Sequence, residues 1–159
     1  MPKTTSGQRR YVPIGFEEPD TIASHLVFII PEATLYTFSI LSSNVHNAWI
    51  RTVAGRLKSD FRYTGSVVYN TFPWPDPTEM QKNEMEKAAK NILDIREKYS
   101  DNSLADLYDD LTMPLELRKA HQMNDRAVMK AFGFSIKDMS ESDCIAALMK
   151  LYQKKIEEK

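Results

Sequence analysis

The sequence predicts an α+β fold, in which mixed strands and two helices are followed by a small helical bundle. Residues 9–72 contain short apolar and aromatic runs interrupted by glycine and proline, which is typical of strands and turns. From residue 78 the apolar side chains recur with a helical period. Residues 72–77 read FPWPDP, with three prolines at alternate positions. We therefore predict a domain boundary there, with one domain over 1–76 and a helical domain over 77–159.

Two strands and a helix are expected first. Residues 9–16 (RRYVPIGF) predict an edge or bent strand, because a proline and a glycine interrupt the β-branched and aromatic run. Residues 21–30 end in LVFII, which predicts a buried strand stopped by Pro31. Pro31 also suits the first position of a helix that continues through Leu41.

A second helix follows, capped by Ser42, Ser43 or Asn44. Its apolar positions predict a buried face made of Val45, Ala48, Trp49, Thr52, Val53 and Leu57. The opposite face predicts either a binding surface or an ordinary solvated stripe, and it carries His46, Asn47, Arg51, Gly55 and Lys58. Residues 61–72 then predict a strand or a bent hairpin that turns at 64–66.

Helix-capping patterns divide the C-terminal part into four helices. Thr78 with Gln81 forms a capping box that opens a helix of about 20 residues. Two further helices are expected to start at a serine that is followed three residues later by an aspartate, at Ser103 with Asp106 and at Ser140 with Asp143. The remaining helix is expected to open at Pro114 and to end at Gly133.

Composition narrows the classes of protein. A chain of 159 residues that is 42% hydrophobic can bury a core without metal or disulfide. Cys144 is the only cysteine, which excludes an internal disulfide and fits a cytoplasmic location. No apolar run approaches the ~20 residues of a spanning helix, so no membrane partner is expected. Residues 1–75 carry seven Lys/Arg against five Asp/Glu, so a polyanion is expected to bind the N-terminal part.

The central stretch combines positive charge with aromatic rings. Four cations lie within 12 residues: Arg51, Arg56, Lys58 and Arg62. Five aromatic residues interleave with them or follow: Phe61, Tyr63, Tyr69, Phe72 and Trp74. This mixture favours nucleic acid, and the alternative is a core strand with a solvated charged edge. Two further hypotheses are a single-strand binder that stacks bases on Phe61, Tyr63 and Trp74, and a protein-interaction module in the helical part.

The sequence offers little for catalysis. Its five glycines form no nucleotide-binding loop. The three histidines, His25, His46 and His121, are far apart and have no metal-ligand spacing. Cys144 falls on the apolar face of the last helix without a basic neighbour, so it is expected to be a buried core residue. We therefore expect no catalytic residue and no metal site in this chain.

Five ordered motifs carry a family resemblance: RRYVPIGF, HNAWIRTVAGRLKSD, FRYTGSVVYNTFPWP, SLADLYDDLTMP and LRKAHQMNDRAV. Together they resemble the C-terminal part of the MmeI-like type II restriction-modification enzymes, which are adenine-specific DNA methyltransferases fused to an endonuclease. The resemblance implies that residues 1–76 are the C-terminal portion of a DNA target recognition domain and that 77–159 are a helical C-terminal domain. Catalysis would then lie upstream.

The resemblance also implies partners and cofactors. The chain would be a non-catalytic fragment that reads double-stranded DNA beside the upstream methyltransferase domain of its parent enzyme. S-adenosylmethionine and magnesium are expected for the parent and no cofactor for this fragment. Residues 70–74 (NTFPW) are the nearest match to the catalytic loop of such methyltransferases, but they lack its spacing and its paired prolines.

The basic stretch supplies the candidate DNA contacts. Lys58 and Asp60 would point to one side of an extended backbone and read a G·C pair, with lysine donating to guanine and aspartate accepting from cytosine. The alternative is a local ion pair between these two side chains. Phosphate or groove contacts are expected from Arg51, Arg56, Arg62 and Tyr63.

Overall fold

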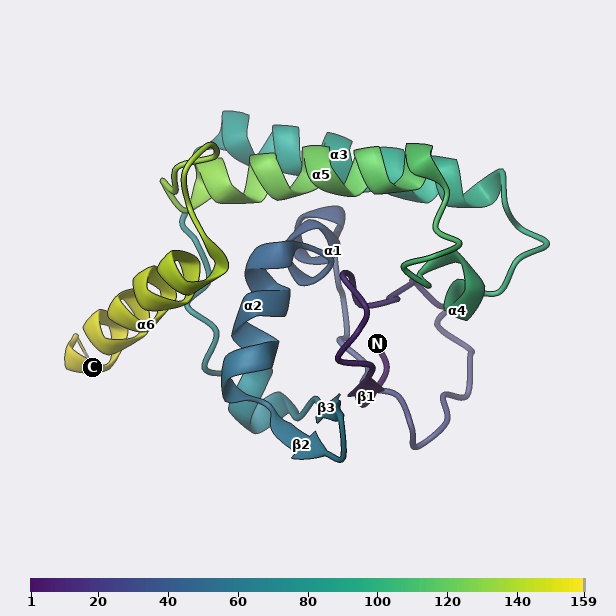
Figure 1. The fold of residues 1–159 in the computed structure, drawn as a ribbon, viewed down its shortest axis with the longest axis horizontal. Helices are drawn as coiled ribbons and strands as arrows, with labels where there is room; N and C mark the ends of the chain where they lie inside the picture. The colour runs from purple at the N-terminus through teal and green to yellow at the C-terminus, as the bar shows by residue number, and fades with distance from the viewer. Residues whose placement is uncertain (159) are drawn as a thin grey trace.

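The computed structural model describes residues 1–158, and Figure 1 shows the order of its elements. The strands are β1 (Thr4–Thr5), β2 (Gly55–Leu57) and β3 (Asp60–Arg62). The helices are α1 (Leu35–Leu41), α2 (Asn44–Val53), the π-helix η1 (Gly65–Tyr69), α3 (Glu79–Glu97), α4 (Leu104–Leu107), α5 (Leu115–Ala131) and α6 (Glu141–Glu157). The predicted α+β class with a helical C-terminal part is therefore confirmed.

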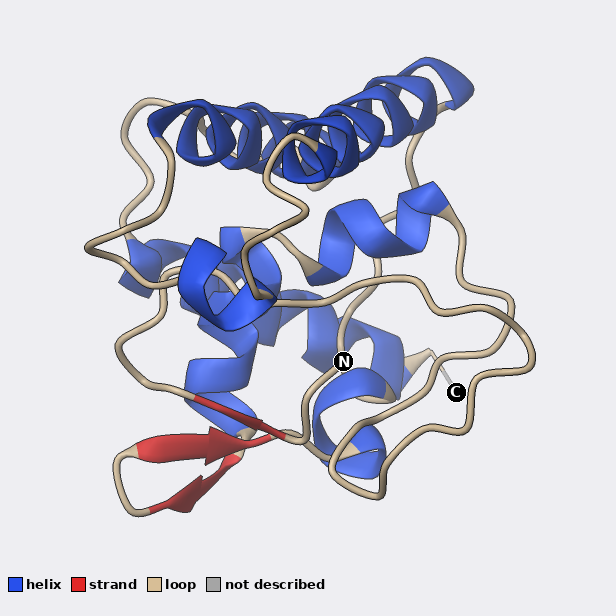
Figure 2. Ribbon diagram, turned by 90° about the vertical axis from the view of Figure 1, so that its right-hand side faces the viewer, coloured by secondary structure: helices blue, strands red, loops and turns tan. Residues whose placement is uncertain are grey.

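The sheet is small and antiparallel, with the strand order β1-β3-β2. β2 and β3 form a hairpin in which Gly55 faces Arg62 and Leu57 faces Asp60. Lys58 and Ser59 are consequently the two-residue loop of the hairpin, and Lys58 has a positive φ of 56°. Figure 2 shows that the hairpin lies at one edge of the molecule, far from α3 and α5.

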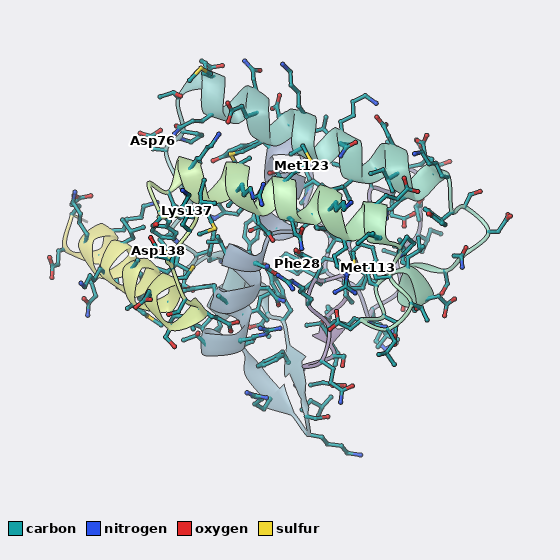
Figure 3. The ribbon with its side chains drawn as sticks, turned by 45° about the horizontal axis from the view of Figure 1, so that its top comes forward. Phe28, Asp76, Met113, Met123, Lys137 and Asp138 are labelled. Carbon is teal, nitrogen blue, oxygen red and sulfur yellow. The ribbon has the colours of Figure 1, made fainter. Side chains whose placement is uncertain are left out.

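The helices form one packed body with the N-terminal part. α3 and α5 lie side by side over the rest of the molecule, and α1 packs against α3 (Figure 1). α6 packs against α2, after a connection that contains Lys137 and Asp138 (Figure 3). Helices α1 and α2 of the N-terminal part therefore pack directly against helices of the C-terminal part, and the two predicted domains share one hydrophobic core. Among residues 1–158, no helix is both long and apolar enough to cross a membrane.

Four predicted helix starts are confirmed, and in each the N-cap side chain accepts a hydrogen bond from the residue three positions later. Ser43 caps α2, and Ser103 caps α4. α3 and α6 each begin with a complete capping box, which is centred on Thr78 and on Ser140. α5 differs slightly, because Pro114 is its N-cap and not its first helical residue.

The two strands predicted before Pro31 are wrong. Residues 9–16 are irregular, although Tyr11, Val12 and Ile14 are buried. In residues 21–30 the only bridge pairs Val27 with Pro2, and the chain turns so that two of its apolar side chains, Leu26 and Ile29, are 64% and 62% exposed.

Two helix boundaries also differ from the prediction. α1 begins at Leu35 because Glu32 has a φ of 54°, which is incompatible with a helix that starts at Pro31. α2 ends at Val53, so Leu57 lies in β2 and is 55% exposed instead of buried.

The strand predicted for residues 61–72 is interrupted by η1. β3 stops at Arg62, and the π-helix turns Val68 into the core. A long-range hydrogen bond and a close approach to an aromatic ring hold the π-helix in this position. The indole Nε1 of Trp49 donates to the carbonyl of Val68 at 3.2 Å, and a Cβ on Gly65 would lie 2.7 Å from the ring of Phe28. The backbone at Gly65 therefore approaches the ring more closely than any other residue type would allow.

Candidate nucleic-acid interface

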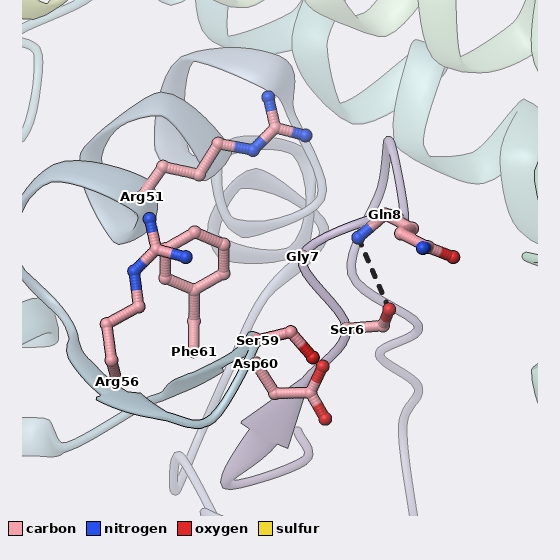
Figure 4. Close-up of a pocket in the computed structure, with 8 residues that line it drawn as sticks. All are labelled: Ser6, Gly7, Gln8, Arg51, Arg56, Ser59, Asp60 and Phe61. Atoms are coloured by element: carbon pink, nitrogen blue, oxygen red, sulfur yellow. Dashed lines mark hydrogen bonds between the residues drawn. The ribbon is translucent and has the colours of Figure 1, made fainter.

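A surface cleft of about 550 Å³ lies beside the β2–β3 hairpin (Figure 4). Its lining comes from the N-terminal segment, the end of α2 and the hairpin, and consists of Ser6, Gly7, Gln8, Arg51, Arg56, Ser59, Asp60 and Phe61. The backbones meet closely here, because a Cβ on Gly7 would lie 2.7 Å from the carbonyl oxygen of Ser59. The cleft therefore joins segments that are far apart in the sequence.

Two of the predicted arginines are held at this cleft in different ways. Arg51 pairs with Glu141, with 2.9 Å between Nη1 and Oε2, and its Nη2 donates to the carbonyl of Arg9 at 3.3 Å. Arg56 lies over the ring of Phe61, with 4.1 Å between the guanidinium carbon and the ring centroid. Arg62 is exposed on β3.

The geometry expected for Lys58 and Asp60 is wrong. Lys58 occupies the first position of the hairpin loop with a positive φ, so the backbone between the two residues is turned and not extended. Asp60 lines the cleft, whereas Lys58 is exposed at the end of the hairpin. Within residues 1–158 no ion pair joins the two side chains, so the alternative of a local pair is not observed. We use the term hairpin face for the four charged residues of the hairpin, Arg56, Lys58, Asp60 and Arg62, although Arg56 pairs with Phe61 and lies on the side opposite to Asp60 and Arg62.

Tyr63 cannot take the contact proposed for it in this conformation, because its side chain is only 2% exposed. Its hydroxyl lies 3.2 Å from Nε2 of His46, which is fully buried. Asn47 is also buried, and its side chain donates to the carbonyl of Arg10 at 2.6 Å. The polar face predicted for α2 is therefore partly internal: His46 and Asn47 each have a hydrogen-bond partner, whereas Nδ1 of His46 has none among the described residues.

The aromatic rings that were expected to stack on the bases of a single strand are mostly not accessible. Phe61 and Tyr63 are buried, and half-buried Trp74 packs edge-on against Tyr69 and Phe72. No broad aromatic surface remains among them for a single strand.

Burial keeps two histidines and the cysteine in their neutral forms. Burial lowers the pKa of His46 and of His121 to about 3, so both are neutral at pH 7. Cys144 is buried as predicted, and burial raises its pKa to about 11, which keeps it an unreactive thiol. No group of His, Cys, Asp or Glu in the described part of the chain could hold a metal ion.

A buried polar cluster connects α5 with the N-terminal part. The carboxylate of Asp125 accepts from the Tyr11 hydroxyl and from the backbone N–H of Asn44, both at 2.8 Å. Asn124 exchanges two hydrogen bonds with Ser39, at 2.6 Å and 2.8 Å. We define the junction cluster as Tyr11, Ser39, His121, Asn124 and Asp125. Because α2 begins at this cluster and leads into β2, the cluster positions the hairpin.

Sequence reasoning found the arginines but missed their neighbours. Ser6, Gly7 and Gln8 belong to a polar N-terminal stretch that has no distinctive pattern. Glu141 is 90 residues from Arg51, and it was recognisable only as a residue in the first turn of a helix. Nothing local in the sequence could have placed these residues at the cleft.

Comparison with known proteins gives consistent results over the whole chain. The family described as the MmeI target recognition domain matches residues 1–76, and the family described as the MmeI C-terminal domain matches residues 77–158. DNA methyltransferase A of Bacillus subtilis (strain 168) is 41% identical over 157 residues, which are 99% of this chain and 18% of that protein.

A solved structure is also similar. The type IIL restriction-modification enzyme MmeI, determined in complex with DNA, matches with a TM-score of 0.92 and 48% identity over 96% of this chain and 20% of the MmeI chain. The chain thus spans about a fifth of the length of these two relatives. It belongs to the MmeI family of restriction-modification enzymes and corresponds to that family's target recognition and C-terminal domains.

Proposed function

We propose that this chain is the DNA-reading, non-catalytic part of an MmeI-like restriction-modification enzyme. The observation that carries the proposal is the 48% identity and TM-score of 0.92 to an enzyme whose structure contains DNA. The cleft beside the hairpin supports it, because arginines and a two-stranded ribbon lie there together. A two-stranded ribbon fits the major groove of B-DNA.

The proposed contacts divide into positioning and reading. Arg51, Arg56 and Arg62 bind phosphate oxygens and set the register without reading sequence. Lys58 and Asp60 read one G·C pair from the end of the hairpin, where lysine donates to guanine N7 and O6 and aspartate accepts from the cytosine amino group.

The chemistry of the parent enzyme belongs to regions outside this chain. The upstream methyltransferase domain binds S-adenosylmethionine and transfers a methyl group to adenine, and magnesium binds the fused endonuclease of the parent enzyme. Residues 1–76 are then the end of the target recognition domain and 77–159 the helical C-terminal domain. This division is supported by the two family matches, which meet between residues 76 and 77. A role on DNA also agrees with the cytoplasmic location expected from the single cysteine.

Binding measurements with the purified chain test the proposal. We expect fluorescence anisotropy to detect binding to labelled duplex DNA that weakens steeply with salt and exceeds binding to the single strand. Calorimetry with S-adenosylmethionine should give no saturable heat, and the chain should transfer no methyl group to DNA. A preference for single strands, a lack of duplex binding or a saturable cofactor isotherm would each contradict the assignment.

A further inference from the structure

Arg51 lies between two neighbouring clefts. It lines the cleft beside the hairpin and also a second cleft of about 490 Å³ between α2 and the start of α6. Gln8 is the other residue that both clefts share. In the first cleft two arginines, Arg51 and Arg56, outnumber the one carboxylate, Asp60. In the second cleft two arginines, Arg10 and Arg51, are matched by two carboxylates, Asp110 and Glu141. The side chain of Arg51 therefore stands where the positive surface of the hairpin gives way to acidic groups from the C-terminal part.

Two acceptors hold the guanidinium of Arg51 at this point. Nη1 lies 2.9 Å from Oε2 of Glu141, and Nη2 donates to the carbonyl of Arg9. These bonds use two of the five guanidinium N–H donors and fix the direction of the side chain. The other two arginines proposed for phosphate contact have no carboxylate partner within residues 1–158, since Arg56 lies over Phe61 and Arg62 is exposed.

A carboxylate and a phosphate offer a guanidinium the same kind of charged acceptor. We infer that Glu141 is a positioning residue that acts through Arg51: it holds the guanidinium at the cleft before DNA binds and competes with DNA phosphate for it afterwards. This inference rests on the proposed function, because the competing ligand is duplex DNA. It also gives α6, in the C-terminal part, control over a contact made by α2.

The exposure of the pair makes the exchange feasible. The side chains of Arg51 and Glu141 are 30% and 51% exposed, and exposed ion pairs are weak. A phosphate can therefore replace the carboxylate on Arg51, but it must first break this pair. The released carboxylate then stands unpaired beside a polyanion and repels it. Glu141 thus lowers the affinity for any duplex, which limits trapping on the large excess of non-specific DNA.

The variant Glu141→Gln tests this role. We expect it to bind a labelled random-sequence 30-base-pair duplex about 3- to 5-fold more tightly than the wild-type chain at 100 mM salt, as an exposed ion pair allows. The salt dependence should become steeper by up to about one unit, because no released carboxylate takes up a cation. Glu141→Asp, which keeps the carboxylate, should restore most of the wild-type affinity.

Glu84→Gln is the matched control. Glu84 is an exposed glutamate on α3 that pairs with Lys130 at 3.3 Å, so its replacement removes the same charge and the same kind of pair away from the cleft. Its affinity for the duplex should change much less. In an Arg51→Ala background, Glu141→Gln should give a clearly smaller gain, because the arginine through which it acts is missing and only the repulsion between the carboxylate and the DNA remains. Urea midpoints should show that all five variants, the double variant included, are folded.

The outcomes separate the inference from the proposed function. If the wild-type chain shows no salt-dependent duplex binding, the proposed function itself fails. If the wild-type chain binds but Glu141→Gln strengthens binding no more than Glu84→Gln does, only the role of Glu141 is overturned. An equal gain in the Arg51→Ala background, or no loss of affinity from Arg51→Ala alone, would overturn it as well.

Discussion

The junction cluster and the hairpin face both consist of polar or charged side chains, but the cluster is buried and the hairpin face is largely exposed. In the cluster, Tyr11, His121 and Asp125 are at most 7% exposed, and each makes a hydrogen bond or a ring contact with a residue far away in the sequence. In the hairpin face, Lys58 and Arg62 are exposed and have no ion-pair partner within the described residues.

The difference separates stability from recognition. A polar group that is buried loses its hydration, so removing its partner is costly to the fold. A polar group on an exposed hairpin remains hydrated, so its replacement hardly affects folding but leaves DNA without a contact. We therefore expect substitutions in the junction cluster to change the free energy of unfolding, and substitutions in the hairpin face to change DNA binding.

The largest effect is expected for Tyr11→Ala. This change removes a ring stacked on His121 at 4.2 Å and the hydrogen bond to Asp125. We expect the free energy of unfolding, measured by urea denaturation, to fall by roughly 3–5 kcal/mol, as for other buried aromatic residues. Tyr11→Phe should cost about 1–3 kcal/mol, because one carboxylate oxygen loses its buried donor.

Tyr99→Phe is the control for the hydroxyl group. Its hydroxyl donates at 2.7 Å to Glu116, whose side chain is 41% exposed and keeps access to water. The midpoint of unfolding should therefore stay unchanged. If Tyr11→Phe and Tyr99→Phe had the same effect, the buried cluster would have no special role in stability.

Acid should weaken the fold through its buried histidines. The pKa values of His46 and His121 are about 3 in the folded chain against about 6.5 when unfolded, so the unfolded chain binds more protons below pH 6.5. Stability is then complete above pH 6.5 and falls as the pH drops, by about 2 kcal/mol for each histidine at pH 5.

Asp125 opposes this loss. Burial raises its pKa to about 6, so its charged form destabilises the fold at neutral pH and protonation below pH 6 relieves that cost. Two histidines outweigh one aspartate, and urea denaturation at pH 7.5 and pH 5 should show a net loss at pH 5. His46→Phe should reduce the loss by about 2 kcal/mol, which is the share of one histidine. Equal stability at both pH values would mean that the histidines are not held neutral.

Reversing the charges of the hairpin face should change sequence preference with little effect on folding. In the parent enzyme, Lys58→Glu with Asp60→Arg should move the preference at one position from G toward C, because glutamate accepts from cytosine and arginine donates to guanine. Each good pair discriminates by roughly 1–3 kcal/mol, which a methylation pattern can resolve.

The matched control is the same reversal at an exposed pair on α3, Lys90→Glu with Asp94→Arg, whose side chains lie 2.7 Å apart. This control should leave the recognition sequence unchanged. If the hairpin variant kept both its activity and its original recognition sequence, Lys58 and Asp60 would not read the base pair.

The same contrast between local and distant contacts explains what the sequence could predict. The starts of α2, α3, α4 and α6 were predictable because each cap bonds a residue three positions away. The π-helix was not, because the burial of Val68 depends on Trp49, which donates to its carbonyl from a different helix. A strand pattern and one turn of helix can share the same short apolar run.

The candidate site divides in the same way. Arg51 and Arg56 were predictable as a cluster of charge, which needs only composition. The hairpin was not, because β2 and β3 have three residues each and β2 is exposed throughout, so no alternation marks them. The burial of Tyr63 was hidden too, since it depends on the pairing of its hydroxyl with His46.

The smallest effect is expected for Arg62→Ala. Arg62 is exposed on β3 and forms no ion pair within residues 1–158, so its loss should leave the urea midpoint unchanged. If it binds a phosphate, the affinity for all duplex sequences should fall together, and the slope of log affinity against log salt should decrease by about one unit. Arg126→Ala removes the same charge from an exposed position on α5 and should leave that slope unchanged. An Arg62 variant that altered which sequence is bound would show instead that this arginine reads a base, and the base-reading part of the hairpin would then extend along β3 from Asp60 to Arg62.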